Sequence, residues 1–145
     1  MPPPQRDDPF KAFNFLVEID GVARAAFSEV SGLESETAVI EYRVGNEKVN
    51  WVRKLPGLTR FGNITLRRGV TQDADLWNWR KEIVDGEIDR RNGAIILLDD
   101  KRNEVVRWNF RNGWICKWVG PTLNAKANEV AIESIEIAHE GLERG

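Results

Sequence analysis

Residues 13–47, FNFLVEIDGVARAAFSEVSGLESETAVIEYRVGNE, decide the fold. Their first part alternates as a strand does, with Phe13, Phe15, Val17 and Ile19 on one face and Asn14, Glu18 and Asp20 on the other. The pair Asp20-Gly21 can supply the two positive φ angles of a type I′ turn. We therefore expect residues 22–27 to return antiparallel to the first strand.

A long strand and a long connection follow this hairpin. Residues 36–44 alternate between an apolar set and a more polar set: Ala38, Ile40, Tyr42 and Val44 against Thr37, Val39, Glu41 and Arg43. Gly45-Asn46 then begins a turn, and Pro56-Gly57 is expected to end a short returning strand. Connections above about 12 residues are commonly functional or disordered. Because residues 46–58 carry Trp51, Leu55 and Leu58, they are predicted to dock on another subunit. The alternative is that they only cover one end of the domain.

Four further segments are expected to be strands: 63–70, 94–98, 104–111 and 129–139. Residues 94–98 are continuously apolar, which is typical of a strand buried on both faces. In the last segment Val130 and Ile132 are out of phase with Ile135 and Ile137, so a β-bulge near Glu133 and Ser134 is predicted.

The period changes between residues 71 and 85, where a helix is predicted. Thr71 or Asp73 is expected to be its N-cap, and Gly86 its C-terminal stop. Its apolar stripe consists of Leu76, Trp77, Trp79, Ile83 and Val84. Helical spacing places both tryptophans at the edges of this stripe, so we expect both to pack in the core.

Composition indicates a single domain spanning residues 1–145, with 41% hydrophobic and 30% charged residues. The predicted fold is mainly β, an antiparallel β-barrel or sandwich of about seven strands with one α-helix packed on it. The formal net charge of −2 gives no support for electrostatic capture of nucleic acid. Residues 1–9 contain four prolines and are expected to form an extended N-terminal arm anchored by Phe10. Neither a signal peptide nor a membrane span is expected. We therefore expect the chain to be synthesised in the cytoplasm.

The sequence offers little for catalysis or metal binding. It has one histidine, His139, and one cysteine, Cys116, and none of the common nucleotide, hydrolase or zinc motifs. Residues 99–104 lack the spacing of a calcium loop, and Glu133 and Glu136 lie three apart on a strand, which places them on opposite faces. We expect no catalytic, cofactor-binding or metal site, and no enzymatic activity.

The order FxVEIDG, FSEVSGLESE, IEYRVGNE resembles the inner-tube proteins of contractile injection particles, a family that includes phage tail tube proteins. Residues 114–120, Pro121, Leu123-Asn124-Ala125 and residues 128–141 resemble the closing strands of the same family. The resemblance therefore spans nearly the whole chain.

The resemblance implies homo-hexameric rings stacked into a tube, with a sheath around it, baseplate and spike proteins at its end, and cargo protein or DNA in the lumen. It also implies a mature location in a phage tail or an extracellular injection particle, without membrane insertion by this chain alone. The predicted subunit interface comprises Phe10, Val49, Trp51, Arg53, Leu55 and Leu58. The predicted lumen-facing residues are Glu41, Arg43, Thr65 and Arg67.

A monomeric ligand-binding β-barrel module is the alternative function, and it would require an apolar cavity. Within the family, the compact length and the opening DPFKAFNFLVEIDGV favour extracellular injection particles over larger phage homologues. The sequence does not separate a main tube protein from a baseplate-proximal relative, and it does not identify the cargo.

Overall fold

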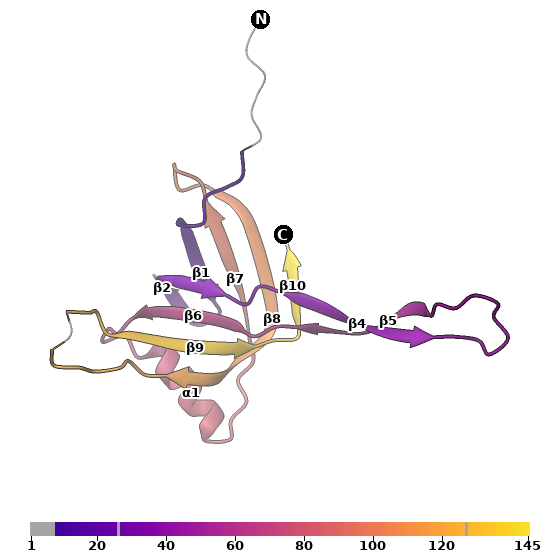
Figure 1. Cartoon of the computed structure of the whole chain (residues 1–145). Coiled ribbons are helices and arrows are strands. Elements are labelled where there is room, and N and C mark those ends of the chain that lie inside the picture. Colours follow the sequence, from indigo (N-terminus) through magenta and orange to yellow (C-terminus); the bar gives the residue numbers. More distant parts are fainter. Residues whose placement is uncertain (1–7, 26, 127) are drawn as a thin grey trace, which may run out of the picture.

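Alternation of apolar and polar residues produces strands through most of the chain, as the computed structural model shows for residues 8–25, 27–126 and 128–145 (Figure 1). The described strands are β1 (Phe15–Ile19), β2 (Val22–Ala25), β3 (Glu29–Ser31), β4 (Ser35–Tyr42), β5 (Arg53–Phe61), β6 (Ile64–Gly69), β7 (Arg91–Leu98), β8 (Glu104–Val119), β9 (Ile132–Ala138) and β10 (Gly141–Arg144). The described residues form one helix, α1 (Asp75–Val84). This confirms a mainly β, antiparallel fold with a single helix.

The body is a sheet in two parts that share β8. Its hydrogen-bonded path, over the described residues, runs β2-β1-β7-β8-β9-β6-β3, with β10 paired to β8 beside it. The first half of β8 pairs with β7 and β10, and the second half pairs with β9. Between the halves lies Asn112, whose φ of 53° is one that asparagine tolerates. Because β2 and β3 stand at the ends of the path, the described strands make an open sandwich and not a closed barrel.

The hydrophobic core lies between the two parts of the sheet and under α1. Its buried residues come from both parts and from the helix: Val17, Ile19, Ile95 and Phe110 from the first, Ile64, Leu66, Ile115, Ile135 and Ile137 from the second, and Leu76 and Trp79 from α1. A smaller cluster of Ala94, Ile96 and Leu98 lies on β7. The continuous apolar run in β7 is therefore buried on both faces, as predicted.

Trp79 anchors α1 to the start of β7. Its indole N–H donates to the backbone oxygen of Asp89 at 2.8 Å, and the Arg91 guanidinium lies 5.0 Å from the centre of its ring. Arg91 also hydrogen-bonds to the Asp89 carboxylate at 2.8 and 3.0 Å, which lowers the pKa of that carboxyl group. The helix ends as predicted, with Gly86 at a φ of 92°.

Two details of α1 differ from the prediction. The N-cap is Ala74, which follows the predicted Asp73 by one residue and the predicted Thr71 by three, and the Asp73 carboxylate still accepts a hydrogen bond from the Asp75 N–H at 3.0 Å. Trp79 is fully buried, whereas Trp77 is 48% exposed and makes an edge-to-face contact with Trp118. Residues two apart on a helix do not share a face, so the core accommodates one of the two tryptophans.

Two strand predictions also need correction. In the Asp20-Gly21 turn only Gly21 has a positive φ, 76°, so the turn is not type I′, although β1 and β2 do pair antiparallel. The register of β9 with β6 is regular across Glu133 and Ser134, and the shift lies in β8 between Ile115 and Lys117. Val130 and Ile132 are instead exposed. No bulge near residues 133–134 is therefore needed.

A projecting hairpin as the candidate docking surface

The β4–β5 hairpin leaves the body of the molecule and projects to one side (Figure 1). The two strands pair only with each other, from Ser35 opposite Phe61 to Tyr42 opposite Arg53. The prediction that the returning strand ends at Pro56-Gly57 is wrong, since β5 continues through both residues. The other edge of β5 has no partner strand, so the missing backbone N–H of Pro56 is tolerated there. A register shift between Thr37 and Val39 accommodates the extra length of β5.

The tip of the hairpin is organised by its own polar contacts. The Arg43 guanidinium donates hydrogen bonds to the backbone oxygens of Glu47 and Val49 at 3.2 and 2.9 Å. The Glu47 carboxylate, largely shielded from solvent, lies 2.9 Å from the Arg53 guanidinium. The turn at Gly45-Asn46 is closed by a hydrogen bond from the Glu47 N–H to the Val44 oxygen at 3.1 Å. The tip therefore has a defined shape before it meets any partner.

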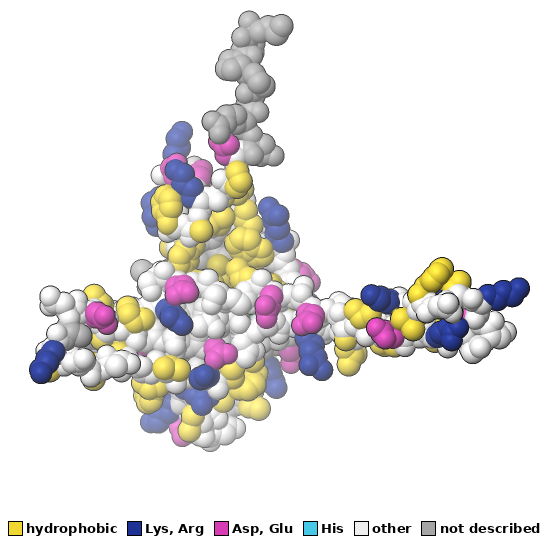
Figure 2. All heavy atoms as spheres, viewed as in Figure 1, with side chains coloured by type: hydrophobic (Ala, Val, Ile, Leu, Met, Phe, Trp, Pro, Cys, Tyr) yellow, Lys and Arg dark blue, Asp and Glu magenta, His cyan; other side chains and the backbone are white. Residues whose placement is uncertain are grey.

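Apolar side chains on this hairpin are exposed. Trp51 is 69% and Leu58 78% exposed, and the apolar residues of β4, predicted to alternate, have no core to face. The exposed large hydrophobic residues of this region are Val39, Ile40, Tyr42, Val44, Trp51, Val52, Leu55 and Leu58. Figure 2 shows hydrophobic side chains at the tip beside Lys and Arg side chains. An exposed apolar set of this kind makes the hairpin a candidate interaction site.

The root of the hairpin is held against the body by close backbone packing. Gly32 has a φ of 86°, and a Cβ at this position would overlap the backbone oxygen of Asn63. The ring nitrogens of His139 face the carbonyl oxygens of Gly62 and Gly141 at 2.9 and 3.0 Å. The Phe61 ring lies 5.8 Å from the His139 ring. His139 thus joins the end of the hairpin to the corner between β9 and β10.

The structure places most of the predicted interface residues together. Val49, Trp51, Arg53, Leu55 and Leu58 all lie on the tip or on β5. Phe10 is 54% exposed but lies in the segment that leads into β1, away from the hairpin (Figure 1). Of the predicted arm, residues 1–7 lie outside the described residues. The hairpin residues therefore lie on one projection, and Phe10 lies elsewhere.

The predicted lumen residues occupy two places. Glu41 and Arg43 lie toward the tip of the hairpin, whereas Thr65 and Arg67 lie on β6, on the face opposite the buried Ile64 and Leu66. Charges of both signs share this β6 face: Arg67 lies 3.8 Å from Glu29, and Lys117 lies 3.8 Å from Glu136. This sheet face is a mixed-charge, hydrophilic surface.

A second projecting segment was not predicted as a contact surface. The connection between β8 and β9 extends on the side opposite the hairpin, and its Leu123 and Val130 are 80% and 75% exposed (Figure 1). Its sequence carries the same signal as residues 46–58, which is apolar residues in a long connection.

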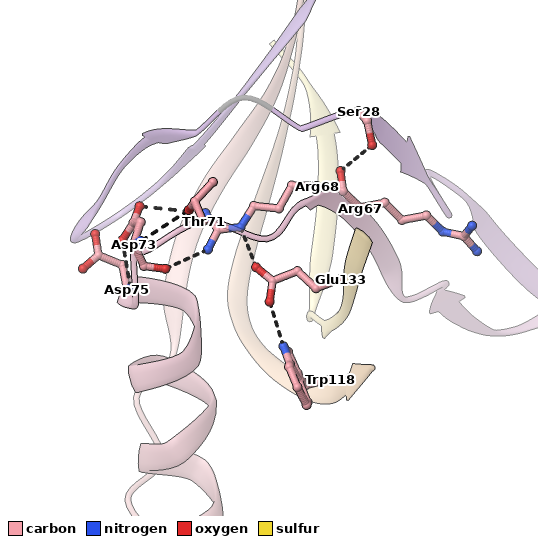
Figure 3. Close-up of polar contacts among 8 residues, drawn as sticks. All are labelled: Ser28, Arg67, Arg68, Thr71, Asp73, Asp75, Trp118 and Glu133. Atoms are coloured by element: carbon pink, nitrogen blue, oxygen red, sulfur yellow. Dashed lines mark hydrogen bonds and ion pairs between the residues drawn. The ribbon is translucent and has the colours of Figure 1, made fainter. Parts of the chain in front are cut away.

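A buried ion network supports the mixed-charge β6 face from behind (Figure 3). The Arg68 side chain is 6% exposed, and its guanidinium lies 2.9 Å from the Glu133 carboxylate and 3.8 Å from that of Asp73. The other Glu133 oxygen accepts a hydrogen bond from the Trp118 indole N–H at 3.3 Å. The network joins β6, β9, the end of β8 and the segment before α1. No sequence motif predicts this network, because Arg68, Trp118 and Glu133 lie far apart in the chain.

Among the described residues, the side chains with catalytic potential take part in structural contacts. Burial raises the pKa of the Cys116 thiol, and the nearby Glu136 carboxylate raises it further. A protonated thiol is a poor nucleophile. A hollow of about 360 Å³ on the body is lined by charged groups that include Glu18, Arg107 and Arg111. Arg107 lies 3.3 Å from Glu18, and Arg111 lies 3.4 Å from Glu143, so both arginines of the hollow have acidic partners.

Comparison with known proteins identifies relatives of this architecture. Residues 11–143 match the family model described as T4-like virus tail tube protein gp19. Among curated protein sequences, none matches the chain.

Solved structures with the same fold include a chain of an extracellular contractile injection system. A chain of the PVC extracellular contractile injection system, from its sheath-tube complex in the extended state, is 27% identical, with a TM-score of 0.86 over 96% of this chain and 93% of that chain. A chain of the anti-feeding prophage tube-terminating cap is 25% identical, with a TM-score of 0.88 over 99% and 95%. Hcp1 from Flavobacterium johnsoniae shares the fold at 15% identity, with a TM-score of 0.57 over 92% and 95%.

Proposed function

The chain belongs to the T4-like tail tube protein family, and from this premise we propose that it forms hexameric rings that stack head to tail into the inner tube of a contractile injection particle. The observation that carries the proposal is the projecting hairpin with its exposed Trp51 and Leu58. A two-stranded ribbon is marginally stable in water and needs another surface to cover it. A second copy supplies that surface by a heterologous contact, whose repetition builds rings and open stacks.

Residues 46–58 are the proposed docking segment. Val49, Trp51, Arg53, Leu55 and Leu58 form its contact set, and Phe10 anchors the N-terminal arm at a separate contact. The pre-organised tip supports this role, because a segment that is already ordered loses less conformational entropy when it binds. Tryptophan in the centre of such a set is typical of an interface residue that contributes most of the binding energy.

The mixed-charge face of β6 is the proposed wall of the lumen. Thr65 and Arg67 would line it, and Glu41 and Arg43 would continue it along the hairpin. Alternating charge supports passage of cargo protein or DNA without tight binding, since each charge on the wall has an opposite neighbour. The role is structural and not enzymatic.

The proposed partners are those implied by a tube inside a particle. A sheath protein would surround it, and baseplate and spike proteins would close one end. Likeness at 27% identity to a chain of a sheath-tube complex supports this assignment. The particle would be a phage tail or an extracellular injection particle. Within the described residues, no helix has the length and apolar character needed to cross a membrane.

The alternative, a monomeric ligand-binding barrel, requires an apolar cavity inside the fold. Large side chains, Trp79 and Phe110 among them, fill the region between the two parts of the sheet. The hollow beside Glu18 and Arg107 is charged and open. These observations favour the tube.

Replacement of Trp51 by alanine tests the proposed function. Negative-stain electron microscopy of the concentrated wild-type protein should show six-fold rings or stacked tubes. For W51A, the protein concentration at which they form should rise at least about tenfold, equivalent to about 1.4 kcal/mol of lost contact energy. Circular dichroism should be unchanged, because Trp51 lies outside the core.

Ile88→Ala is the matched control, since Ile88 is 62% exposed and lies outside the hairpin. I88A should assemble like the wild type. Tubes formed by W51A at the wild-type concentration, or a loss of its circular dichroism signal, would contradict the docking assignment.

A further inference from the structure

A histidine side chain connects the β4–β5 hairpin to the body of the molecule. His139 lies at the corner between β9 and β10, half-buried beside the rings of Phe61 and Phe110, whose centres are 5.8 and 6.1 Å from its own. Its Nε2 lies 2.9 Å from the backbone oxygen of Gly62, and its Nδ1 lies 3.0 Å from that of Gly141. Both ring nitrogens therefore face carbonyl oxygens.

These two contacts together require two ring protons. A carbonyl oxygen only accepts hydrogen bonds, so a ring nitrogen must carry a hydrogen to bond to it. A neutral imidazole has one N–H donor and one acceptor nitrogen, whereas the imidazolium cation has two N–H donors. Only protonated His139 therefore makes both contacts. In the neutral ring, one nitrogen and one carbonyl oxygen meet as two acceptors.

The charged groups around the ring favour its positive charge. The Glu34 side chain packs against Gly62, and a Cβ on that glycine would overlap it. Glu140, the residue after the histidine, adds a second carboxylate. Arg111 on the neighbouring β8 opposes the charge, but its guanidinium lies 3.4 Å from the Glu143 carboxylate. Carboxylates beside the ring thus outnumber the one cation, and an acidic environment stabilises an imidazolium.

The contact to Gly62 lies where the hairpin leaves the body. Gly62 follows the last residue of β5, and its N–H donates to the Glu34 oxygen at 3.2 Å across the root of the hairpin. Gly141 is the first residue of β10, which pairs with β8 in the body of the sheet. The histidine therefore connects the hairpin to the body, and this connection is complete only when the ring is protonated.

We propose that the root of the β4–β5 hairpin is a proton-dependent joint formed by His139, Gly62 and Gly141. The protonated ring holds both carbonyl groups, and loss of its proton at mildly alkaline pH releases one of them. The hairpin then has more freedom of direction, so docking between copies of the chain weakens. This last step rests on the proposed function, whereas the proton-dependent contact does not.

Folding should take up a proton at His139, because the cation makes two contacts in the folded chain and none in the unfolded chain. The added stability should be present below about pH 6.5, where histidine ordinarily titrates, and should be lost as the pH rises beyond that value. The joint should therefore be tightest under mildly acidic conditions.

Nuclear magnetic resonance of the ring tests the contacts directly. The chain has one histidine, so the ring signals of an untagged, isotope-labelled protein belong to His139 alone. At about pH 6 two ring N–H protons should be observed, because hydrogen bonds in a half-buried site slow their exchange with water. Observation of one ring N–H, or of none, would overturn the proposal.

Thermal unfolding of the wild type and of His139→Gln measures the contribution of the proton, since glutamine donates a hydrogen bond but does not titrate. The Tm of the wild type should exceed that of H139Q by at least about 3 °C at about pH 6, and this excess should fall by at least half at about pH 8.5. An excess that is equal at the two pH values would overturn the proposal.

Other groups that titrate in this range cancel in the comparison. Desolvation and a hydrogen bond to Asp89 raise the pKa of Glu82, and burial raises the pKa of the Cys116 thiol. Both groups are present in the wild type and in H139Q. The difference in Tm between the two chains therefore reports the residue at position 139.

A chain in which the histidine is moved is the matched control. The double variant Ile88→His, His139→Gln carries its histidine at a position that is 62% exposed in the wild type and lies outside the hairpin. It should show no protected ring N–H, and its Tm relative to H139Q should not decline between the two pH values. The same decline as in the wild type would show that any histidine gives the effect, and the proposal would be wrong.

Electron microscopy at the two pH values separates the joint from the proposed function. The protein concentration at which rings and tubes form should rise at least fivefold between about pH 6 and about pH 8.5 for the wild type, and less than twofold for H139Q. A similar rise in both chains would overturn the control of assembly by the joint. If no rings form at either pH while the resonance and unfolding results are as expected, the proposed function fails and the joint stands.

Discussion

Neighbouring arginines on β6 show how burial decides what a residue does. Arg68 is 5% exposed and its guanidinium contacts Glu133 and Asp73, whereas Arg67 points away from the core toward an exposed Glu29 at 3.8 Å (Figure 3). Successive residues on a strand face opposite sides of the sheet. Arginine therefore holds buried elements together at position 68 and is a surface charge at position 67.

Replacement of Arg68 by alanine should lower the free energy of unfolding by about 3 kcal/mol, because Glu133 would be left as an unpaired, largely buried charge. Replacement of Arg67 by alanine should cost less than about 1 kcal/mol, as is usual for an exposed ion pair. Urea unfolding followed by tryptophan fluorescence measures both. If R68A and R67A lowered the free energy of unfolding equally, the buried network would stabilise the fold no more than an exposed ion pair does.

At the scale of single elements, the hairpin β4–β5 depends on its root. It continues the ladder of β3 and β6, which pair from Glu29 opposite Arg67 to Ser31 opposite Thr65, and it turns away from the body between Gly32 and Asn63. The absence of a Cβ at Gly32 allows the two backbones to approach at this bend. Direction of the hairpin is thus set by one glycine and by the His139 contact to Gly62.

Gly32→Ala should destabilise the protein by about 1–3 kcal/mol, because alanine at this φ is strained and its methyl group would meet the Asn63 backbone. Rings and tubes should also form less readily, since the hairpin would leave the body at a different angle.

Gly45→Ala is the matched control. Gly45 lies in the tip, has no positive φ, and has no atom within 4 Å of an added Cβ. The free energy of unfolding of this variant, measured by thermal unfolding, should change by less than about 0.5 kcal/mol, which is typical of a surface position. A G32A protein that unfolds and assembles like G45A would show that the root does not set the hairpin's direction.

At the scale of the whole molecule, apolar surface is distributed over separate projections and not over one flat patch. The hairpin extends to one side, the connection with Leu123 and Val130 to the other, and α1 with Trp77 lies at a third place (Figure 1). A protein acting alone has no use for apolar side chains at the ends of two projections. This distribution suits a subunit with several neighbours.

Assembly should therefore protect the hairpin tip from proteolysis. Trypsin should cleave the unassembled chain after Arg43, Lys48 or Arg53, all of which lie in or beside the exposed tip. In purified tubes the same bonds should be cut at least tenfold more slowly, because a neighbouring subunit covers them. Mass spectrometry of the fragments gives the sites, and equal cleavage rates in the two samples would contradict docking through residues 46–58.

The sequence by itself determined the elements whose patterns are local. The alternation in β1, the apolar run in β7, the stop at Gly86 and the apolar residues of segment 46–58 were all readable, because each depends on neighbours close in the chain. The ordered similarity to tail tube proteins was readable for the same reason, and the family match over residues 11–143 confirms it.

Only the tertiary structure decided which apolar faces are covered. Alternation in β4 predicted a strand, but nothing local shows that its apolar residues project into solvent while those of β1 enter the core. Likewise the local sequence does not show which of Trp77 and Trp79 is buried. The position of β8 and β7 against α1 decides that Trp79 is. The Arg68–Glu133 pair spans 65 positions. Burial and long-range pairing depend on which strands become neighbours, and that is a property of the whole fold.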